Sequence, residues 1–165
     1  MYLHLTTGTE DFLQKLKDKH SNEPLILASN VQKSILLYTS ESKKNIFQMP
    51  QTFDIVDQTT KDAPQKLISL HRFHLDKDNQ SAIEFHLKNT FSEICNRYEP
   101  ASSFLLLEKK NKSIMIMIFW SEELTYKQFQ ASIPYEKMLE VKKHYSVKDG
   151  AFFTPYIEQS YLIVK

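Results

Sequence analysis

The sequence predicts an α+β protein, and two observations support this fold class. After Leu67, apolar runs and helical patterns alternate in the order strand, helix, strand, strand, helix, strand. Before Lys66, a shorter series of the same kind is present. This order is typical of the ferredoxin-like plan, in which helices cover one face of an antiparallel sheet. We expect residues 1–66 to form an N-terminal α+β extension, a shortened ferredoxin-like half, and residues 67–165 to form a ferredoxin-like domain.

The N-terminal region begins with a predicted strand at Tyr2–Thr6. Hydroxyl residues and the acidic Glu10 then favour the start of a helix, which carries apolar Phe12, Leu13 and Leu16 and ends near His20. Two short apolar runs, Leu25–Ala28 and Ser34–Tyr38, follow and are typical of a hairpin.

The remainder of this region is less regular in pattern. We expect a further short strand at Ile46–Phe47 and a short helix that opens at Pro50 and carries Phe53, Ile55 and Val56. The polar stretch Thr59–Lys66 contains Pro64, and it is therefore the candidate linker between the two units.

The second region gives stronger patterns. Leu67–Leu75 predicts a strand, and Ser81-x-x-Glu84 suits the capping box of a long helix that ends at Pro100. Its apolar stripe recurs at helical spacing and comprises Ile83, Leu87, Thr90, Phe91, Ile94 and Tyr98.

Two strands are expected next, at Phe104–Leu107 and Ile114–Trp120. The second is apolar at every position, which predicts that both of its faces are covered. We expect Ser121 to cap one helix, Pro134 to start another, and Phe152–Val164 to form a closing strand. The sheets of the two halves should pack against each other.

Composition excludes several function classes. Hydrophobic residues make up 41% of the 165 residues, so the chain can bury a core without a disulfide or a metal. Only two glycines are present, which excludes glycine-rich phosphate loops and dinucleotide fingerprints. The net charge of +1 lacks the basic excess of a nucleic-acid-binding protein.

The segments that direct export or insertion are also not recognisable. The start of the chain has no basic region followed by an apolar one, and the longest apolar run, Ile114–Trp120, is much shorter than the ~20 residues of a membrane span. We therefore expect a cytoplasmic protein with neither a nucleic acid nor a membrane as its partner.

Candidate chemistry rests on a few side chains. Strand alternation puts His71 and Phe73 on one face and His74 on the other, so the two histidines cannot chelate one ion, and no metal site is predicted. Both are more simply interpreted as ordinary strand residues. Cys95 fits a small buried hydrophobe better than a reactive thiol. Trp120 fits a core anchor, or it borders an aromatic-lined cavity.

Three stretches together carry a family resemblance, namely Thr7–His20, Phe47–Gln58 and Phe119–Tyr135. In their order and spacing they resemble the antibiotic-biosynthesis-monooxygenase (ABM) superfamily, in the branch that contains the staphylococcal TRAP proteins and the Bacillus haem-degrading monooxygenase HmoB. The resemblance implies a ferredoxin-like dimeric α/β-barrel domain with an N-terminal extension packed on it. It also implies a Gram-positive, cytoplasmic setting.

The same resemblance implies a haem site. Haem-degrading members use a distal Asn on the first strand, a Trp at the end of the third strand and an iron-ligating His on a following helix. These positions fall on His71, Trp120 and Leu139. His71 and Trp120 are thus the candidate catalytic residues, and His71, Phe73, Trp120 and Leu139 are the candidate cofactor contacts.

Leu139 is the serious departure, because leucine has no lone pair for iron. His144 lies five residues further on, which on a helix points about 140° away. His71 itself could also ligate from the opposite side.

Three functions therefore stay open. The leading one is a haem-binding or haem-degrading monooxygenase-like protein, with haem as the implied cofactor and a cavity beside Trp120. The second is a catalytically silent TRAP-like protein that acts in stress response or signalling through protein contacts. The third is a cofactor-free monooxygenase on a small aromatic substrate, with His71 as the base. The chain is expected to be a monomer with an internal pseudo-dimer, or a homodimer.

Overall fold

A computed structural model describes residues 1–144 and 156–165. Within these residues the chain forms eight strands and four helices. The strands are β1 (Tyr2–Gly8), β2 (Ile26–Ser29), β3 (Ser34–Ser40), β4 (Gln51–Thr60), β5 (Leu67–His74), β6 (Ser102–Glu108), β7 (Ser113–Trp120) and β8 (Tyr156–Ile163). The helices are α1 (Glu10–Lys19), α2 (Gln80–Tyr98), α3 (Glu123–Gln130) and α4 (Ile133–His144).

The strands close into one barrel in the order β1-β3-β2-β8-β5-β7-β6-β4. The order contains the same pattern twice, as β4-β1-β3-β2 and as β8-β5-β7-β6, so the ferredoxin-like arrangement predicted for the second region recurs in the first. Antiparallel pairing of β2 with β8 and of β4 with β6 joins the two patterns. Joining the edges satisfies backbone groups that an open sheet would leave unpaired.

The expected face-to-face packing of two separate sheets is thus replaced by a shared closed sheet. The barrel interior is filled by apolar side chains from both regions, among them Leu5, Phe53, Leu70, Met117 and Tyr161. A division of the chain into residues 1–66 and 67–165 stays a prediction, because both parts contribute to this one interior.

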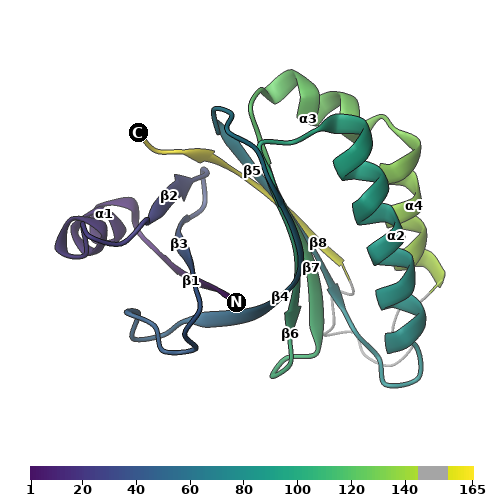
Figure 1. The fold of residues 1–165 in the computed structure, drawn as a ribbon, viewed down its shortest axis with the longest axis horizontal. Helices are drawn as coiled ribbons and strands as arrows, with labels where there is room; N and C mark the ends of the chain where they lie inside the picture. Colours follow the sequence, from purple (N-terminus) through teal and green to yellow (C-terminus); the bar gives the residue numbers. More distant parts are fainter. Residues whose placement is uncertain (145–155) are drawn as a thin grey trace.

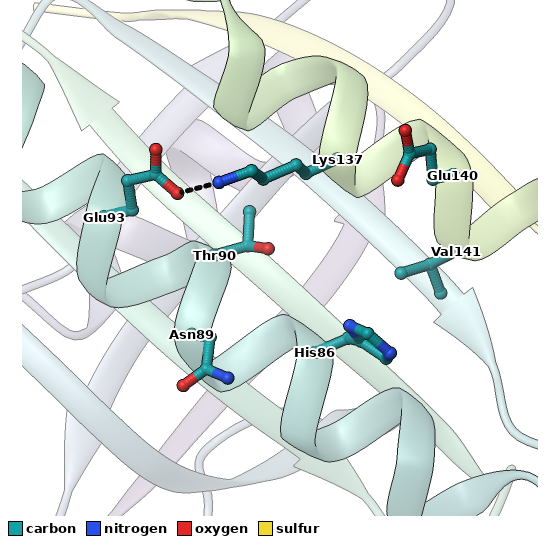
Figure 2. A pocket seen from close by; sticks show the side chains of 7 residues that line it. All are labelled: His86, Asn89, Thr90, Glu93, Lys137, Glu140 and Val141. Atoms are coloured by element: carbon teal, nitrogen blue, oxygen red, sulfur yellow. Dashed lines mark hydrogen bonds and ion pairs between the residues drawn. The ribbon is translucent and has the colours of Figure 1, made fainter.

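Helices cover the two outer faces of the barrel unequally. Helices α2, α3 and α4 lie over β5, β6, β7 and β8, whereas α1 lies on the opposite side of the barrel, over β1, β2 and β3 (Figure 1). Helix α4 packs alongside α2, and Figure 2 shows the facing side chains of this pair. Every residue of β7 is buried, which confirms the prediction that both of its faces are covered.

One predicted helix is wrong. Residues 51–56 belong to strand β4, because this segment pairs with β1 on one side and with β6 on the other. Its β-branched and aromatic residues favour a strand once partners are present, and Phe53 points into the barrel core. The short strand predicted at Ile46–Phe47 is also wrong, since these residues have no regular secondary structure.

Two predicted caps differ from the structure. Helix α2 starts at Gln80, with Asn79 as its N-cap, so Ser81 already lies inside the helix and makes no cap. Helix α3 has Glu122 rather than Ser121 at the N-cap position, and its side chain makes no cap hydrogen bond. The cap at α1 is confirmed, because Thr9 accepts a hydrogen bond from the backbone N–H of Phe12.

The predicted linker begins two residues too early, because Thr59 and Thr60 end strand β4. The predicted closing strand is confirmed as β8, and its first part, residues 152–155, lies outside the described residues. No helix in the described ranges has the length and apolar character needed to cross a membrane.

Candidate functional site

The candidate residues gather on the helix-covered face of the barrel. Strand alternation brings Ser69, His71 and Phe73 of β5 to this face. The register then sets His71 opposite Glu158 and Phe73 opposite Tyr156 on the neighbouring strand β8. Trp120, at the end of β7, pairs with Leu67 at the start of β5 and packs in the same cluster.

A chain of hydrogen bonds connects these side chains. The Trp120 indole Nε1–H donates to Ser69 Oγ at 2.8 Å. The Ser69 hydroxyl lies 3.1 Å from His71 Nε2, and His71 Nδ1 lies 3.0 Å from the Tyr156 hydroxyl. Tyr156 in turn donates to Glu158 Oε2 at 3.2 Å. A single tautomer of His71, with the proton on Nδ1, satisfies every member of this chain.

Glu158 is the acceptor on which the network ends. Besides Tyr156, it accepts hydrogen bonds from the hydroxyls of Tyr126 at 2.8 Å and Tyr135 at 2.6 Å. Gln130 adds a fourth donor at 3.3 Å. The helices α3 and α4 supply these three additional donors. The carboxylate therefore ties the helical layer to β8.

The electrostatics follow from burial and from this carboxylate. Burial lowers the pKa of His71 to about 4, against a smaller opposing effect of Glu158, so the imidazole is neutral at pH 7. Burial alone would raise the pKa of Glu158, but the hydrogen bond from Tyr135, the charge of His71 when it is protonated, and the hydrogen bonds from Tyr126 and Gln130 together lower that pKa. Burial, together with the carboxylate, raises the pKa of Tyr135 to about 12.

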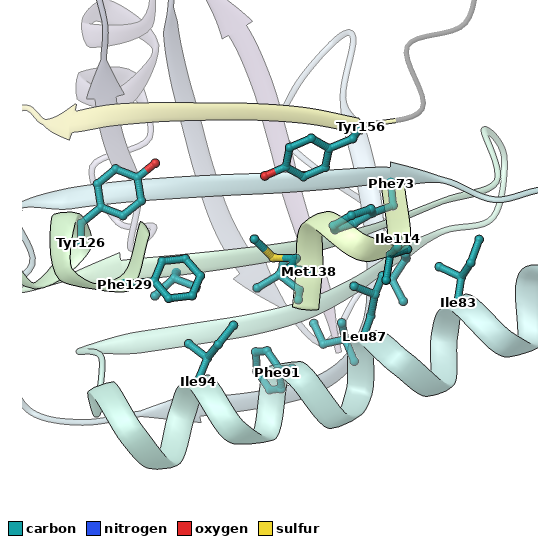
Figure 3. Close-up of a cluster of buried hydrophobic side chains, with 14 of the residues drawn as sticks. Phe73, Ile83, Leu87, Phe91, Ile94, Ile114, Tyr126, Phe129, Met138 and Tyr156 are labelled. Carbon is teal, nitrogen blue, oxygen red and sulfur yellow. The ribbon is translucent and has the colours of Figure 1, made fainter. Parts of the chain in front are cut away.

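The space beside Trp120 is filled by side chains, so the prediction of a cavity at this position is wrong. Trp120 and His71 are both 0% exposed. Phe129 packs against both rings, with centroid distances of 5.3 Å to Trp120 and 5.8 Å to His71. Figure 3 shows Phe129 and Tyr126 among the side chains of the buried cluster to which Trp120 belongs. Tyr126 covers Trp120 further at 5.8 Å. The aromatic residues that the sequence suggested as the lining of a cavity pack instead on one another.

These residues do not fit a haem at the position that the resemblance implies. Leu139, on α4, is a half-buried hydrophobe packed against the same cluster and has no donor atom for iron. Both ring nitrogens of His71 are already hydrogen-bonded, so neither has a lone pair directed at free space. His144 is the last residue of α4, and its side chain lies outside the described part.

The structure brings together three of the four predicted site residues on the sheet, namely His71, Phe73 and Trp120. Leu139 approaches them from the helical layer. Whether they have the predicted roles stays a prediction. Among the described residues, no group of three histidine, cysteine or acidic side chains is arranged to hold a metal ion.

The sequence patterns did not reveal the other polar members of the network around His71 and Glu158, which are Ser69, Tyr126, Tyr135 and Tyr156, nor Glu158 itself. Ser69-x-His71 and Tyr156-x-Glu158 both have the period of two that places polar side chains on one strand face. Polar residues at this spacing within a predicted strand are a signal that could have identified three of them, Ser69, Tyr156 and Glu158.

Comparison with known proteins agrees with the fold. No family model matches the chain. The signal transduction protein TRAP of Staphylococcus epidermidis is 26% identical over 132 residues, which cover 80% of this chain and 78% of the relative. A solved structure described as a major regulator of staphylococcal pathogenesis superposes with a TM-score of 0.83 at 15% identity, over 100% of both chains.

Two Listeria monocytogenes structures are also similar. A ferredoxin-fold protein related to antibiotic biosynthesis monooxygenases has a TM-score of 0.80 at 17% identity, over 99% of this chain and 94% of that one. The haem-degrading enzyme LmHde has a TM-score of 0.76 at 15% identity, over 98% and 99%. The structural neighbours are thus ABM-fold, monooxygenase-like proteins, which confirms the fold that the resemblance implied.

Proposed function

We propose that this chain is a catalytically silent protein with the ABM fold that acts in signalling through contacts with other proteins. The TRAP relative carries the name of a signal transduction protein. The observation that carries the proposal is the enclosure of Trp120 and His71, which have no exposed surface and whose polar atoms are all paired with neighbouring side chains.

Catalysis at this face would require a substrate to displace packed aromatic rings. Phe129 and Tyr126 pack against the indole ring of Trp120, and Tyr135 and Tyr156 pack against the imidazole ring of His71. A histidine with a pKa of about 4 is also a weak base at neutral pH. Both features favour a structural role for the network.

Titration of haemin into the purified protein tests this proposal. We expect no shift of the Soret band at micromolar protein, and no oxygen uptake when a reductant is added. A saturable Soret shift with one haemin per chain, followed by loss of the haem absorbance under reducing conditions, would contradict the proposal.

Haem binding is the second candidate, and it is supported by the likeness to LmHde over 98% of this chain. The variant Leu139→His separates two reasons for an absent Soret band. If only the iron ligand is missing, this variant acquires a Soret shift. If the packing around Trp120 prevents entry, the variant remains as silent as the natural chain.

A cytoplasmic location and a monomeric state belong to the same proposal. Cys95 is an unpaired cysteine, as is usual in a reducing compartment. The chain closes its own barrel from two halves with the same strand order, whereas the family resemblance implies a barrel made by two copies. Cell fractionation and light scattering on a size-exclusion column test these two statements.

A further inference from the structure

The N-terminal region contains a groove that the proposed function has not used. It lies between α1 and residues 46–49, and its volume is about 500 Å³. Its lining is mostly apolar, and α1 adds the basic side chains of Lys15 and Lys19. Its lining includes Phe12, Lys15, Leu16, Lys19 and Met49.

Two of these apolar side chains are unusually exposed. Phe12 is 60% exposed and Met49 is 86% exposed. A cluster of exposed aromatic and methionine side chains at a groove is typical of surfaces that bind other proteins. The groove also lies where two of the three stretches that carry the family resemblance, Thr7–His20 and Phe47–Gln58, meet in space.

The second half of the molecule shows what covers the equivalent helix face. Leu13 in α1 and Leu87 in α2 are both 0% exposed, and each lies on the face of its helix that packs on the sheet. Four residues stand at the same offsets from each of them, one before and two, three and six after. In α1 these are Phe12, Lys15, Leu16 and Lys19, and in α2 they are His86, Asn89, Thr90 and Glu93.

Figure 2 shows these four α2 residues beside helix α4, where Glu93 and Lys137 form an ion pair of 2.9 Å. The structure has α3 and α4 between β7 and β8, but only residues 41–50, without a helix, between β3 and β4. The four α1 residues are therefore faced by residues 46–49, which form no helix, whereas the four α2 residues are faced by helix α4.

We propose that this groove binds an acidic amphipathic helix of a partner protein, against the α1 positions that correspond to the α2 positions beside α4. The inference rests on the proposed function, because it names the surface through which the chain contacts its partner. Helices that dock in grooves present apolar residues at spacings of three and four, which here would cover Phe12, Leu16 and Met49.

The positive charges of Lys15 and Lys19 favour an acidic partner. Lys19 stands six residues after Leu13, as Glu93 stands six residues after Leu87. Glu93 pairs with the positive Lys137, so the positive Lys19 calls for a negative partner. Among the described residues, neither Lys15 nor Lys19 has an ion-pair partner. Carboxylates on the incoming helix would complement both ammonium groups.

Two matched peptides test the proposal on the full chain. Both copy residues 133–144, stapled into a helix because a free helix of this length is marginally stable in water. The acidic peptide carries Lys137→Glu, Lys142→Glu and Lys143→Glu, and the basic peptide carries Glu136→Lys and Glu140→Lys. The apolar residues are identical, so only the sign of the charge differs.

Fluorescence anisotropy should show the acidic peptide binding at least roughly tenfold more tightly than the basic one, a difference of about 1.4 kcal/mol. The double variant Lys15→Glu/Lys19→Glu should reverse this preference. Phe12→Ser should weaken the binding of both peptides. The control Lys88→Glu/Lys110→Glu changes the net charge equally at exposed positions outside the groove and should retain the preference.

Equal binding of the two peptides, or unchanged binding in Lys15→Glu/Lys19→Glu, would overturn the proposal. A concentration-dependent dimer that Phe12→Ser abolishes would also overturn it, because a second copy would then occupy the groove. Oleate that binds the groove while neither peptide does would assign it to a small amphiphile instead. Haem binding with the peptide preference intact would remove the proposed function but leave the groove assignment standing.

Discussion

The two halves of the barrel share a strand order but differ in what covers them. In the second half, three helices cover the outer face, and its polar side chains are paired in a network that ends on Glu158. Among the described residues of the first half, α1 is the one helix on the face, Phe47 packs beside it, and Phe12 and Met49 remain exposed. The face where the family resemblance implies chemistry is thus closed, and the groove for which we propose partner binding lies in the other half.

The difference is consistent with the physics of buried polar groups. Buried hydroxyls, an imidazole and a carboxylate are tolerated only when each has a hydrogen-bond partner. Once Ser69, His71, Tyr156 and Glu158 bond to one another, few of their polar atoms remain for a ligand. The groove beside α1 keeps its lysine ammonium groups in water, where they can pair with an incoming partner.

The largest expected effect comes from truncating an aromatic side chain in each half. Trp120→Ala should lower the free energy of unfolding by about 3–5 kcal/mol, because it leaves a cavity and removes the partner of Ser69. Phe12→Ala should change it by less than about 0.5 kcal/mol, because that ring is mostly in water. Urea denaturation measures both, and equal losses would remove the contrast between the halves.

The next effect is a pH dependence from His71. Its pKa is about 4 in the folded chain and 6.5 in the unfolded one, so the unfolded chain binds the proton more tightly. The contribution of neutral His71 to the free energy of unfolding should therefore be fully present above about pH 6.5. The free energy of unfolding should fall by up to about 3 kcal/mol as the pH drops towards 4. Urea unfolding between pH 7.5 and 4 measures it.

The matched variant for this dependence is His71→Gln, whose side chain does not titrate. Its stability should lack the part of the slope between pH 6.5 and 4 that His71 supplies. If the natural chain and this variant lose stability in parallel over that range, the histidine is not held neutral as described.

A smaller effect is expected from the acceptor of the network. Glu158→Gln replaces one carboxylate oxygen by an amide donor, so at least one tyrosine hydroxyl loses its acceptor, at a cost of about 2 kcal/mol. The control is Glu123→Gln, which breaks an exposed pair with Lys127 and should cost less than about 0.5 kcal/mol. Comparable losses in the two variants, measured by urea denaturation, would argue against a special role of the network.

The smallest effects on stability belong to the groove. Phe12→Ser and Met49→Ser should each leave the free energy of unfolding within about 0.5 kcal/mol of the natural chain. The same substitutions should weaken binding of the acidic peptide. A substitution that unfolds the chain would show instead that the groove residues are part of the core.

Local patterns predicted much of this fold and little of the site. Helix α2 and strand β7 were predictable because their periodicity is sustained over many residues. Strand β4 was not, since Pro50 suits the start of a helix and the pairing partners of the strand lie far along the chain.

The site depends on contacts between distant segments. His71 and Trp120 could be identified from the family resemblance. Ser69, which hydrogen-bonds to both, could not, because the Trp120 indole lies 51 residues away in the sequence. Glu158 could not be recognised as an acceptor, because its donors Tyr126 and Tyr135 come from two helices whose positions only the fold sets. Sequence patterns therefore identified the face and missed the interactions that close it.

The enclosure of Trp120 is the central claim, and fluorescence tests it directly because the chain has one tryptophan. Acrylamide quenching of the folded chain at pH 7 should be far weaker than quenching of the same chain unfolded in urea, with blue-shifted emission. Quenching of the folded chain as strong as that of the unfolded chain would show an indole open to solvent, and the closed site described above would be wrong.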